Sequence, residues 1–419
     1  MRTFLKAFKI PELRKKIFVV LGILLVFRLL AAIPVPGIDP TRLQGFLSGN
    51  QLLGFLNIFS GGALANLSVM MLGVGPFITA TIIMQLLTMV FPRLKEIYYE
   101  EGATGRAKFN RISRYLTVPL AALQAYGLLN LLTNQGVIPR LGFASVLQNV
   151  IVITAGSLIL MWLGELITEQ KIGNGISLII FAGIVSGIPQ ALQSIIFSYT
   201  PSLLTTYLIF LVVAVIVIAG VVFVTEGERK IPVIYSKRVR GNKMYGGASS
   251  YLPLKVNQAG VIPIIFAISL LLFPQFLAQI VALFAPDFSI TLQGWVTAFS
   301  NNFALYGIAY FALVVIFTYF YTSITFNPEE IAKNLQQSGG FVPGIRPGDP
   351  TTHFLKSTTA KITLFGAIFL GLIAVLPIMT QGITNTKSLT IGGTALLIVV
   401  AVALETFRQI QSQVSLREY

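Results

Sequence analysis

The side chains that could perform acid–base, nucleophilic or metal chemistry are few in this chain. Its 419 residues include no cysteine, which excludes disulfides, thiol nucleophiles and thiolate metal sites. The single histidine, His353, stands among polar residues, and one imidazole cannot build a histidine-based metal cluster. No phosphate-binding loop of the GxxxxGK[ST] type occurs. The sequence therefore predicts no catalytic residue, no metal site and no cofactor, and we expect a protein that is not an enzyme.

Binding chemistry is better represented, because 30 Lys and Arg outnumber 15 Asp and Glu and give a net charge of +15. Two long segments, at about residues 226–256 and 327–360, combine basic side chains with turn and strand signals. The first predicts a hairpin-like projection, and the second predicts a short helix at 328–336 followed by turns. Structured basic loops suit an acidic partner or the phosphates of RNA. Retention of positive charge beside a membrane is the alternative explanation for most of this charge.

The elements that must position these loops are membrane spans, since 55% of the residues are hydrophobic and only 11% are charged. The first apolar run follows six basic residues and resembles a signal peptide. An uncleaved span is the simpler interpretation, because the chain downstream is equally apolar. About ten apolar runs occur, at residues 17–33, 77–90, 112–132, 146–167, 176–197, 203–224, 259–284, 305–326, 362–379 and 389–404.

Lys and Arg are distributed one-sidedly between the segments that connect these runs. Only Arg42, Arg140 and Lys387 lie in one set of segments, and Arg28 lies inside the first run; all the others lie in the alternate set. Basic residues mark the cytoplasmic side, so we expect both termini in the cytoplasm. Ten spans divide into two sets of five, residues 1–200 and 201–419, and an odd number per set implies inverted repeats.

The second run is preceded by an apolar stretch that is interrupted by Gly73, Gly75 and Pro76. Residues 63–72 are too few to cross the roughly 30 Å of hydrocarbon, which takes about 20 helical residues. A short segment at membrane depth must be shielded by protein or line a water-filled cavity. We therefore expect a short re-entrant helix, able to pivot between this break and the preceding Gly-Gly pair. The alternative is that these residues only lead into a kinked span.

Six stretches, spread over both halves, are similar to the SecY/Sec61-alpha family of protein-conducting channels. They are FRLLAAIPVPGID, NIFSGGALANLSVMMLGVGPFI, MWLGELITEQKIGNGISLIIFAGI, LPLKVNQAGVIPIIFA, NPEEIAKNLQQSGGFVPGIRPG and GGTALLIVV. The resemblance covers essentially the whole chain. It implies an all-α polytopic membrane protein, with ten transmembrane helices in two inverted five-helix halves around a central pore and with a re-entrant plug helix. A lateral gate is then expected between the second and seventh spans, flanked by the third and eighth.

Carried over by position, the resemblance implies four groups of functional residues. The apolar pore ring falls on Val74, Ile78, Ile176, Ile180, Ile265 and Ile398. The plug falls on Ala63, Leu64, Ala65, Asn66, Leu67, Ser68, Val69, Met70, Met71 and Leu72. Polar lateral-gate residues are Thr79, Gln124 and Asn257, and the contacts for the SecA motor or the ribosome are Arg346, Lys237, Arg238, Arg240 and Lys243.

The chemistry of these groups fits such roles. Val74/Ile78 and Ile176/Ile180 are each four residues apart, so each pair shares one helix face. A ring of aliphatic side chains closes a pore to ions because water leaves it readily. Ordinary core or lipid-facing packing is the alternative for each isoleucine, as interhelical hydrogen bonding is for the polar residues. After Gly241 the family often has two consecutive basic residues, where this chain has Asn242 and Lys243.

The resemblance implies a passive channel that passes unfolded secretory polypeptides across the bacterial plasma membrane and releases hydrophobic segments sideways into lipid. The implied partners are SecE, SecG, the SecA motor, the ribosome, signal peptides, nascent or preprotein chains and anionic lipids. A secondary transporter is a rival class, but it needs ionisable residues at the midplane, where Arg28 is the main candidate; Glu165 and Glu405 lie near span ends. An intramembrane hydrolase would need a catalytic constellation that the sequence does not contain.

Overall fold

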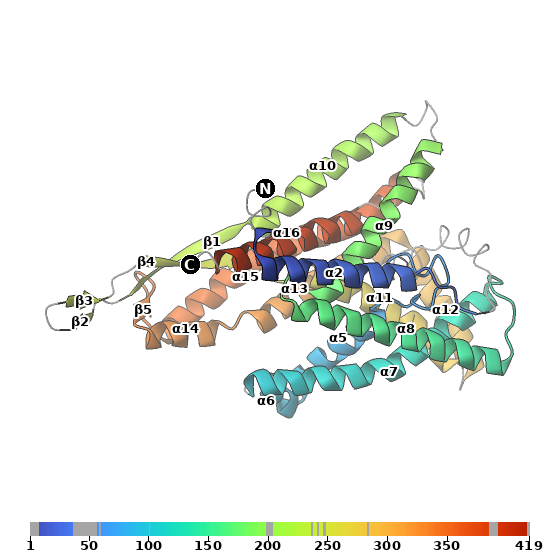
Figure 1. Ribbon diagram of the computed structural model, residues 1–419, viewed down its shortest axis with the longest axis horizontal. Coiled ribbons are helices and arrows are strands. Elements are labelled where there is room, and N and C mark those ends of the chain that lie inside the picture. Colours follow the sequence, from blue (N-terminus) through green and yellow to red (C-terminus); the bar gives the residue numbers. More distant parts are fainter. Residues whose placement is uncertain are drawn as a thin grey trace.

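In a computed structural model, the described part of the chain comprises residues 8–36, 57, 60–99, 101–197, 204–235, 238–240, 243–245, 249–282, 285–384 and 393–416. These residues form an elongated bundle of helices from which a narrow β-hairpin projects at one end (Figure 1). We call that end the hairpin end and the opposite one the far end.

Each of the ten predicted apolar runs overlaps one helix of the described chain. These helices are α2 (Pro11–Leu30), α5 (Gly75–Val90), α7 (Gly102–Asn134), α8 (Phe143–Glu169), α9 (Gly175–Phe197), α10 (Leu204–Glu226), α11 (Ile262–Val281), α13 (Phe303–Thr325), α15 (Asp349–Thr384) and α16 (Gly393–Ser415). Three more helices lie between them: α6 (Pro92–Tyr99), α12 (Pro286–Asn301) and α14 (Pro328–Gln337). Helices α6 and α12 were not predicted from the sequence.

Length and composition make the chain a polytopic helical membrane protein. Five helical segments of the described chain can each cross a membrane unaided: Gly102–Asn134, Phe143–Glu169, Phe303–Gln337, Asp349–Met379 and Ala395–Ser415. Three shorter apolar helical segments, Gly175–Pro189, Leu211–Glu226 and Ile262–Ala278, accompany them. The count of ten spans and the division into residues 1–200 and 201–419 stay predictions.

A sharp bend of 115° separates α5 from α6. Phe91 lies between the two helices with φ −106° and ψ 109°, which is an extended conformation. The cause is Pro92, because a proline ring disfavours the helical region for the residue before it. The second apolar run therefore ends at Val90, and the charged residues that follow turn away from its axis.

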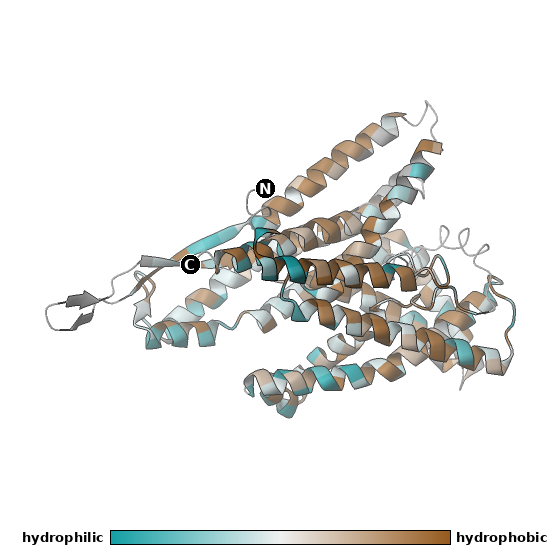
Figure 2. Cartoon of the chain, viewed as in Figure 1, coloured by the Kyte–Doolittle hydropathy of each residue, from teal (hydrophilic) through white to brown (hydrophobic). Residues whose placement is uncertain are grey.

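The two predicted halves meet along two seams. At one seam α11 packs against α5 and α7, and at the other α16 packs against α9. The beginning of α2 and the end of α16 both lie toward the hairpin end (Figure 1). Hydrophilic residues gather at that end, over β1, α14 and the start of α7, while the middle of the bundle is mostly hydrophobic (Figure 2).

Large apolar side chains also cover the outside of the bundle. On α10, for example, Leu211 and Ile216 are 60% and 64% exposed, and on α2 Leu25 is 62% exposed. Apolar exposure on this scale is typical of a surface that another apolar phase covers. In a chain with this composition that phase is the hydrocarbon of a membrane.

The predicted projection is a long antiparallel hairpin. Strand β1 (Glu228–Tyr235) pairs with β4 (Ser249–Lys255), and toward the tip β2 (Arg238–Arg240) pairs with β3 (Lys243–Tyr245). A short strand from the second loop, β5 (Gly340–Phe341), adds to β1 and gives the order β4-β1-β5. The predicted short helix is α14, whose first turn is capped by the Asn327 side chain.

Candidate functional site: an apolar ring beside a re-entrant segment

The six residues assigned to the ring come from both halves of the chain. Val74 precedes α5 and Ile78 lies on it, Ile176 and Ile180 lie on α9, Ile265 lies on α11 and Ile398 lies on α16. All except Ile176 are at most 5% exposed, and Ile176 is half-buried against the same cluster of apolar side chains. The structure therefore brings the six into one continuous apolar cluster.

The position of Ile176 and Ile180 is fixed by the start of α9. The Asn174 side chain accepts hydrogen bonds from the backbone N–H groups of Ile176 and Ser177, at 3.1 and 3.2 Å. The Thr168 hydroxyl accepts from the Gly175 N–H at 2.9 Å and donates to the Gly164 carbonyl at 2.9 Å. A methyl group on Gly175 would lie 1.8 Å from the Gly164 carbonyl oxygen, so only glycine permits this approach of α9 to α8.

Residues 60–74 form the re-entrant segment, and they are a run of turns rather than the continuous helix that the sequence predicts. Several N–H groups bond to the carbonyl three residues back, as from Leu67 to Leu64 and from Met71 to Ser68, both at 2.9 Å. Leu67 has φ +44°, which a right-handed helix cannot contain. The glycines at 61, 62 and 73 also have positive φ and end any helix at either side.

The re-entrant segment is buried inside the bundle. Of its residues 63–72 only Asn66 is exposed, while Ala65 and Val69 are half-buried. Ala63 and Met70 pack into the cluster that contains the ring, and four other members pack into a second cluster with α7 and α8. These four are Leu64, Leu67, Met71 and Leu72. The segment thus fills the space between the ring and the far half of α7 and α8.

Hydrogen bonds fasten the segment to the chain that follows α2. The Val35 N–H donates to the Leu67 carbonyl at 2.8 Å, and the Val69 N–H donates to the Ile33 carbonyl at 3.0 Å. These two bonds form an antiparallel bridge around Pro34 and Ser68. The bridge satisfies backbone groups that would otherwise be costly at membrane depth.

Helix α8 holds the exit of the segment. The Ser157 hydroxyl donates to the Gly73 carbonyl at 3.0 Å. A methyl group on Gly156 would lie 2.1 Å from the Val69 carbonyl oxygen, so the segment lies directly against the α8 backbone. Neither Gly156 nor Ser157 was predicted from the sequence, although a serine inside an apolar run is a signal for an internal hydrogen bond.

The three polar residues assigned to the lateral gate lie near the seam between α5, α7 and α11. Thr79 donates to the carbonyl of Gly75 in its own helix at 3.0 Å, and Gln124 on α7 is 7% exposed. Asn257, just before α11, donates from Nδ2 to the Gly260 carbonyl at 3.1 Å and leaves its buried Oδ1 unpaired. Within the described residues no hydrogen bond joins one of the three to another. Apolar side chains of α5 and α11, among them Ile82 and Ile268, share one cluster at this seam.

The residues assigned to motor or ribosome contact lie at the hairpin end. Arg346 is exposed in the turn between β5 and α15, where its own carbonyl accepts a hydrogen bond from the Thr351 hydroxyl at 2.8 Å. Arg238 and Arg240 lie on β2 and Lys243 lies on β3, with Arg240 opposite Lys243. Lys237 lies outside the described residues.

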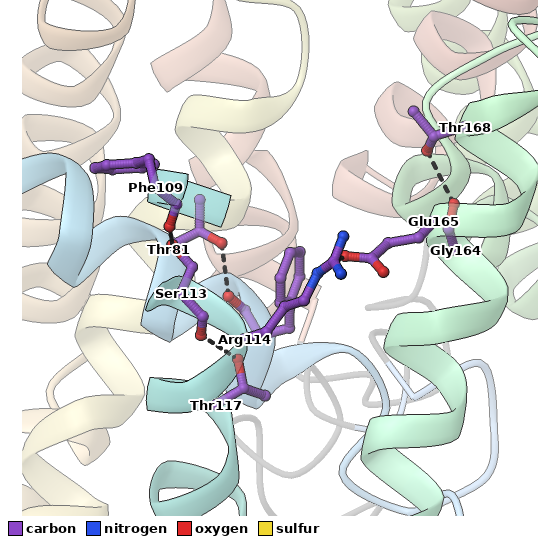
Figure 3. Close-up of polar contacts among 9 residues, drawn as sticks. Thr81, Phe109, Ser113, Arg114, Thr117, Gly164, Glu165 and Thr168 are labelled. Carbon is purple, nitrogen blue, oxygen red and sulfur yellow. Dashed lines mark hydrogen bonds and ion pairs between the residues drawn. The ribbon is translucent and has the colours of Figure 1, made fainter. Parts of the chain in front are cut away.

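An ion pair joins α7 to α8 at the same end (Figure 3). The Arg114 Nε atom lies 2.6 Å from a carboxylate oxygen of Glu165, and the two side chains are 48% and 23% exposed. A second ion pair, between Arg408 and Glu226, joins α16 to α10 at 2.7 Å. Glu165 therefore forms a structural contact between neighbouring helices.

Arg28, the candidate for a transporter-type coupling site, donates from Nη1 to the Gly61 carbonyl at 2.8 Å. No Asp or Glu of the described chain forms an ion pair with it. In the same part of the chain no group of three or more His, Asp or Glu side chains could hold a metal ion. The described residues at this place form an apolar cluster beside a buried segment.

Comparison with known proteins gives a consistent result. Residues 68–407 match the family model SecY. The chain is 44% identical over 439 residues to protein translocase subunit SecY of Streptomyces coelicolor, and the match covers 99% of this chain and 98% of the relative.

Solved structures share the fold at lower identity. One is a protein-conducting channel with a TM-score of 0.66 and 20% identity. Another is Sec61 in the canine ribosome–channel complex from the endoplasmic reticulum, with a TM-score of 0.62 and 20% identity. Each match covers 96% of this chain and 93% of the other.

Proposed function

The chain belongs to the SecY family, and on this premise we propose that it forms the channel through which unfolded secretory polypeptides cross the bacterial plasma membrane. The observation that carries the proposal is the meeting of aliphatic side chains from α5, α9, α11 and α16 beside a buried re-entrant segment. A transporter would place charged groups at this point, and an enzyme would place a nucleophile or a metal.

In the resting channel the ring and the plug act in series. The ring of Val74, Ile78, Ile176, Ile180, Ile265 and Ile398 excludes water and therefore ions, without any charged gate. The plug, residues 63–72, blocks the space beside it. A polypeptide opens the passage by displacing the plug and spreading the ring, because aliphatic side chains give way without breaking an ion pair.

Hydrophobic segments leave sideways through the seam of α5 and α11. Weak contacts suit this gate, since it must hold when idle and part when a signal sequence intercalates. Thr79, Gln124 and Asn257 supply hydrogen-bonding groups there, and interhelical hydrogen bonds in membranes contribute only about 0.6–2 kcal/mol each. The Oδ1 atom of Asn257 is buried without a hydrogen-bond partner, and parting of the seam exposes it to an arriving segment.

The channel is passive, so the energy comes from partners. We propose that the SecA motor and the ribosome bind at the hairpin end through Arg346, Lys237, Arg238, Arg240 and Lys243, which places both termini and this end in the cytoplasm. A small subunit resembling SecE clamps the two halves, SecG joins them, and anionic lipids contact the basic residues near the membrane surface. None of these partners adds a catalytic residue to this chain.

Site-specific cross-linking tests the proposal. A photo-reactive residue at Ile78 or Ile265 forms adducts with a secretory chain arrested during export, because both side chains line the path. The same probe at Ile308, which is 68% exposed on the outside of α13, forms none and serves as the matched control. Adducts at Ile308 alone, or no adducts in an active complex, would rule out the channel assignment.

A further inference from the structure

The entrance of the re-entrant segment is held by a contact that the ring and the plug do not explain. Arg28 occupies the last turn of α2, and its Nη1 atom donates to the carbonyl of Gly61, 33 positions later in the chain, at 2.8 Å. A charged donor makes a stronger hydrogen bond than a neutral one. A cation on an apolar helix is costly unless it has a specific partner, and the Gly61 carbonyl is such a partner for Arg28.

Gly61 is enclosed by two helices at this point. Its φ is +69°, and a methyl group on it would lie 2.8 Å from Cζ of Phe27 and 2.9 Å from Cα of Gly183. Phe27 precedes Arg28 on α2, and Gly183 lies on α9. The entrance turn therefore touches the backbone of α9 directly, which requires glycine on both sides.

The position of Gly183 connects this contact to the ring. Gly183 follows Ile180 by three residues, so the two lie about one turn apart on α9. A methyl group on Gly183 would lie 2.1 Å from the Gly61 Cα, a distance that forces the entrance turn away from α9. Arg28 and Gly183 thus fix the same turn from opposite elements.

We propose that Arg28 and Gly183 form a latch that holds the entrance of the plug in the resting channel. Arg28 is a positioning residue: it ties the Gly61 carbonyl to α2, and the glycine contact lets that turn rest on the helix that carries Ile176 and Ile180. Ser157 holds the end of the segment at Gly73, and the latch holds its beginning at Gly61, so the two contacts together fix the plug in the resting channel. This inference rests on the channel function proposed above.

The absence of cysteine allows a direct test, because one introduced thiol is the only thiol in the chain. Met70→Cys places it in the segment at a position that is 1% exposed. The measurement is its rate of reaction with a water-soluble maleimide in the complete, membrane-embedded complex. Arg28→Met raises the rate by about tenfold, since a charge-assisted hydrogen bond no longer opposes local opening. Arg28→Lys, which keeps the charge and a donor, gives a smaller increase.

Three comparisons separate the latch from other causes. Gly183→Ala raises the reaction rate of the thiol at position 70 as much as Arg28→Met does. The double variant raises it little further, because both substitutions disrupt the same latch. Arg140→Met, at an exposed arginine with no hydrogen bond to the described chain, leaves the rate unchanged. A thiol at Val314, which is 0% exposed on α13, reacts equally slowly with and without Arg28→Met. An unchanged rate at position 70, or equal increases at positions 70 and 314, would overturn the latch.

Ion leakage through the idle complex in vesicles provides a separate readout. Arg28→Met increases both thiol reactivity and leakage if latch and channel are both correct. Increased reactivity without leakage supports the latch and contradicts only the contribution of the plug to the seal, because the ring then excludes ions by itself. Leakage without increased reactivity at position 70 contradicts the latch alone.

Discussion

The Ser157 hydroxyl on α8 donates a 3.0 Å hydrogen bond to the carbonyl of Gly73, at the point where the re-entrant segment gives way to α5. Both groups are buried, and the bond joins parts of the chain that are 84 residues apart. It is the only side-chain hydrogen bond from the described part of α8 to this segment. The break before α5 is therefore held from outside its own helix.

Ser157→Ala removes this bond and leaves the Gly73 carbonyl unsatisfied, at a cost of about 1–3 kcal/mol to the closed state. We expect greater ion leakage through the idle complex in vesicles. Ser113→Ala is the matched control, because the buried Ser113 hydroxyl donates only to the Phe109 carbonyl of its own helix. Equal leakage from the two variants would remove Ser157 from the closing contacts.

Gly73→Ala places a side chain at φ +60°, where a left-handed conformation costs about 1–2 kcal/mol for a residue other than glycine. We expect altered opening, measured as changed leakage and export, while the amount of assembled complex in the membrane stays normal. Gly22→Ala on α2 is the control, since a methyl group there meets no atom within 4 Å. Loss of assembly with Gly73→Ala would mean that the break serves folding rather than gating.

The Arg114–Glu165 pair contributes modestly to stability, because both side chains are partly exposed to solvent. A double-mutant cycle with Arg114→Gln and Glu165→Gln should give a coupling of about 0.2–1 kcal/mol in thermal unfolding of the purified protein, decreasing with added salt. The Lys108–Glu101 pair, 59% and 38% exposed, is the comparison and should couple less. A coupling well above this range would indicate a gating contact between α7 and α8.

Arg346→Glu reverses the charge of an exposed side chain in a turn at the hairpin end. We expect export driven by SecA in vesicles to fall by about tenfold or more, because like charges across an interface suppress binding. Thermal unfolding should not change, since no hydrogen bond or ion pair joins the Arg346 side chain to the part of the chain that the structure describes. Lys333→Glu, at an exposed position on α14, is the matched charge reversal. Normal export by the Arg346 variant would exclude this residue from the motor site.

The helices were largely predictable because their apolar runs are long and contain few charged residues. The hairpin was predictable as well, since strand residues such as Ile231 and Val233 alternate with exposed ones in β1. Helix α12 escaped prediction, because its 16 residues are too short and too polar for a span. Strand β5 has only two residues, and its pairing with β1 depends on the tertiary approach of two loops.

The backbone conformation of the re-entrant segment could not be predicted from local sequence. Its Ala, Leu and Met residues favour a helix, yet Leu67 adopts a positive φ because its backbone joins a bridge with Val35. The partner of Arg28 was equally hidden, since it depends on the contact of Gly61 with Gly183 across three separate elements. Such contacts follow from packing of distant residues, which local propensity does not encode.

The base of the hairpin is connected to α11 and rests against α15. Strand β1 follows α10 almost directly, and β4 leads toward α11. Where the two strands meet the bundle, the Val256 N–H donates to the Gly227 carbonyl at 2.9 Å. A methyl group on Gly366 of α15 would lie 2.6 Å from the Val256 carbonyl oxygen, so the base of the hairpin lies directly against the α15 backbone. We expect a sideways load at the tip of the hairpin to rotate it about this contact with α15. Such a load is transmitted to the start of α11, the helix that forms one side of the seam.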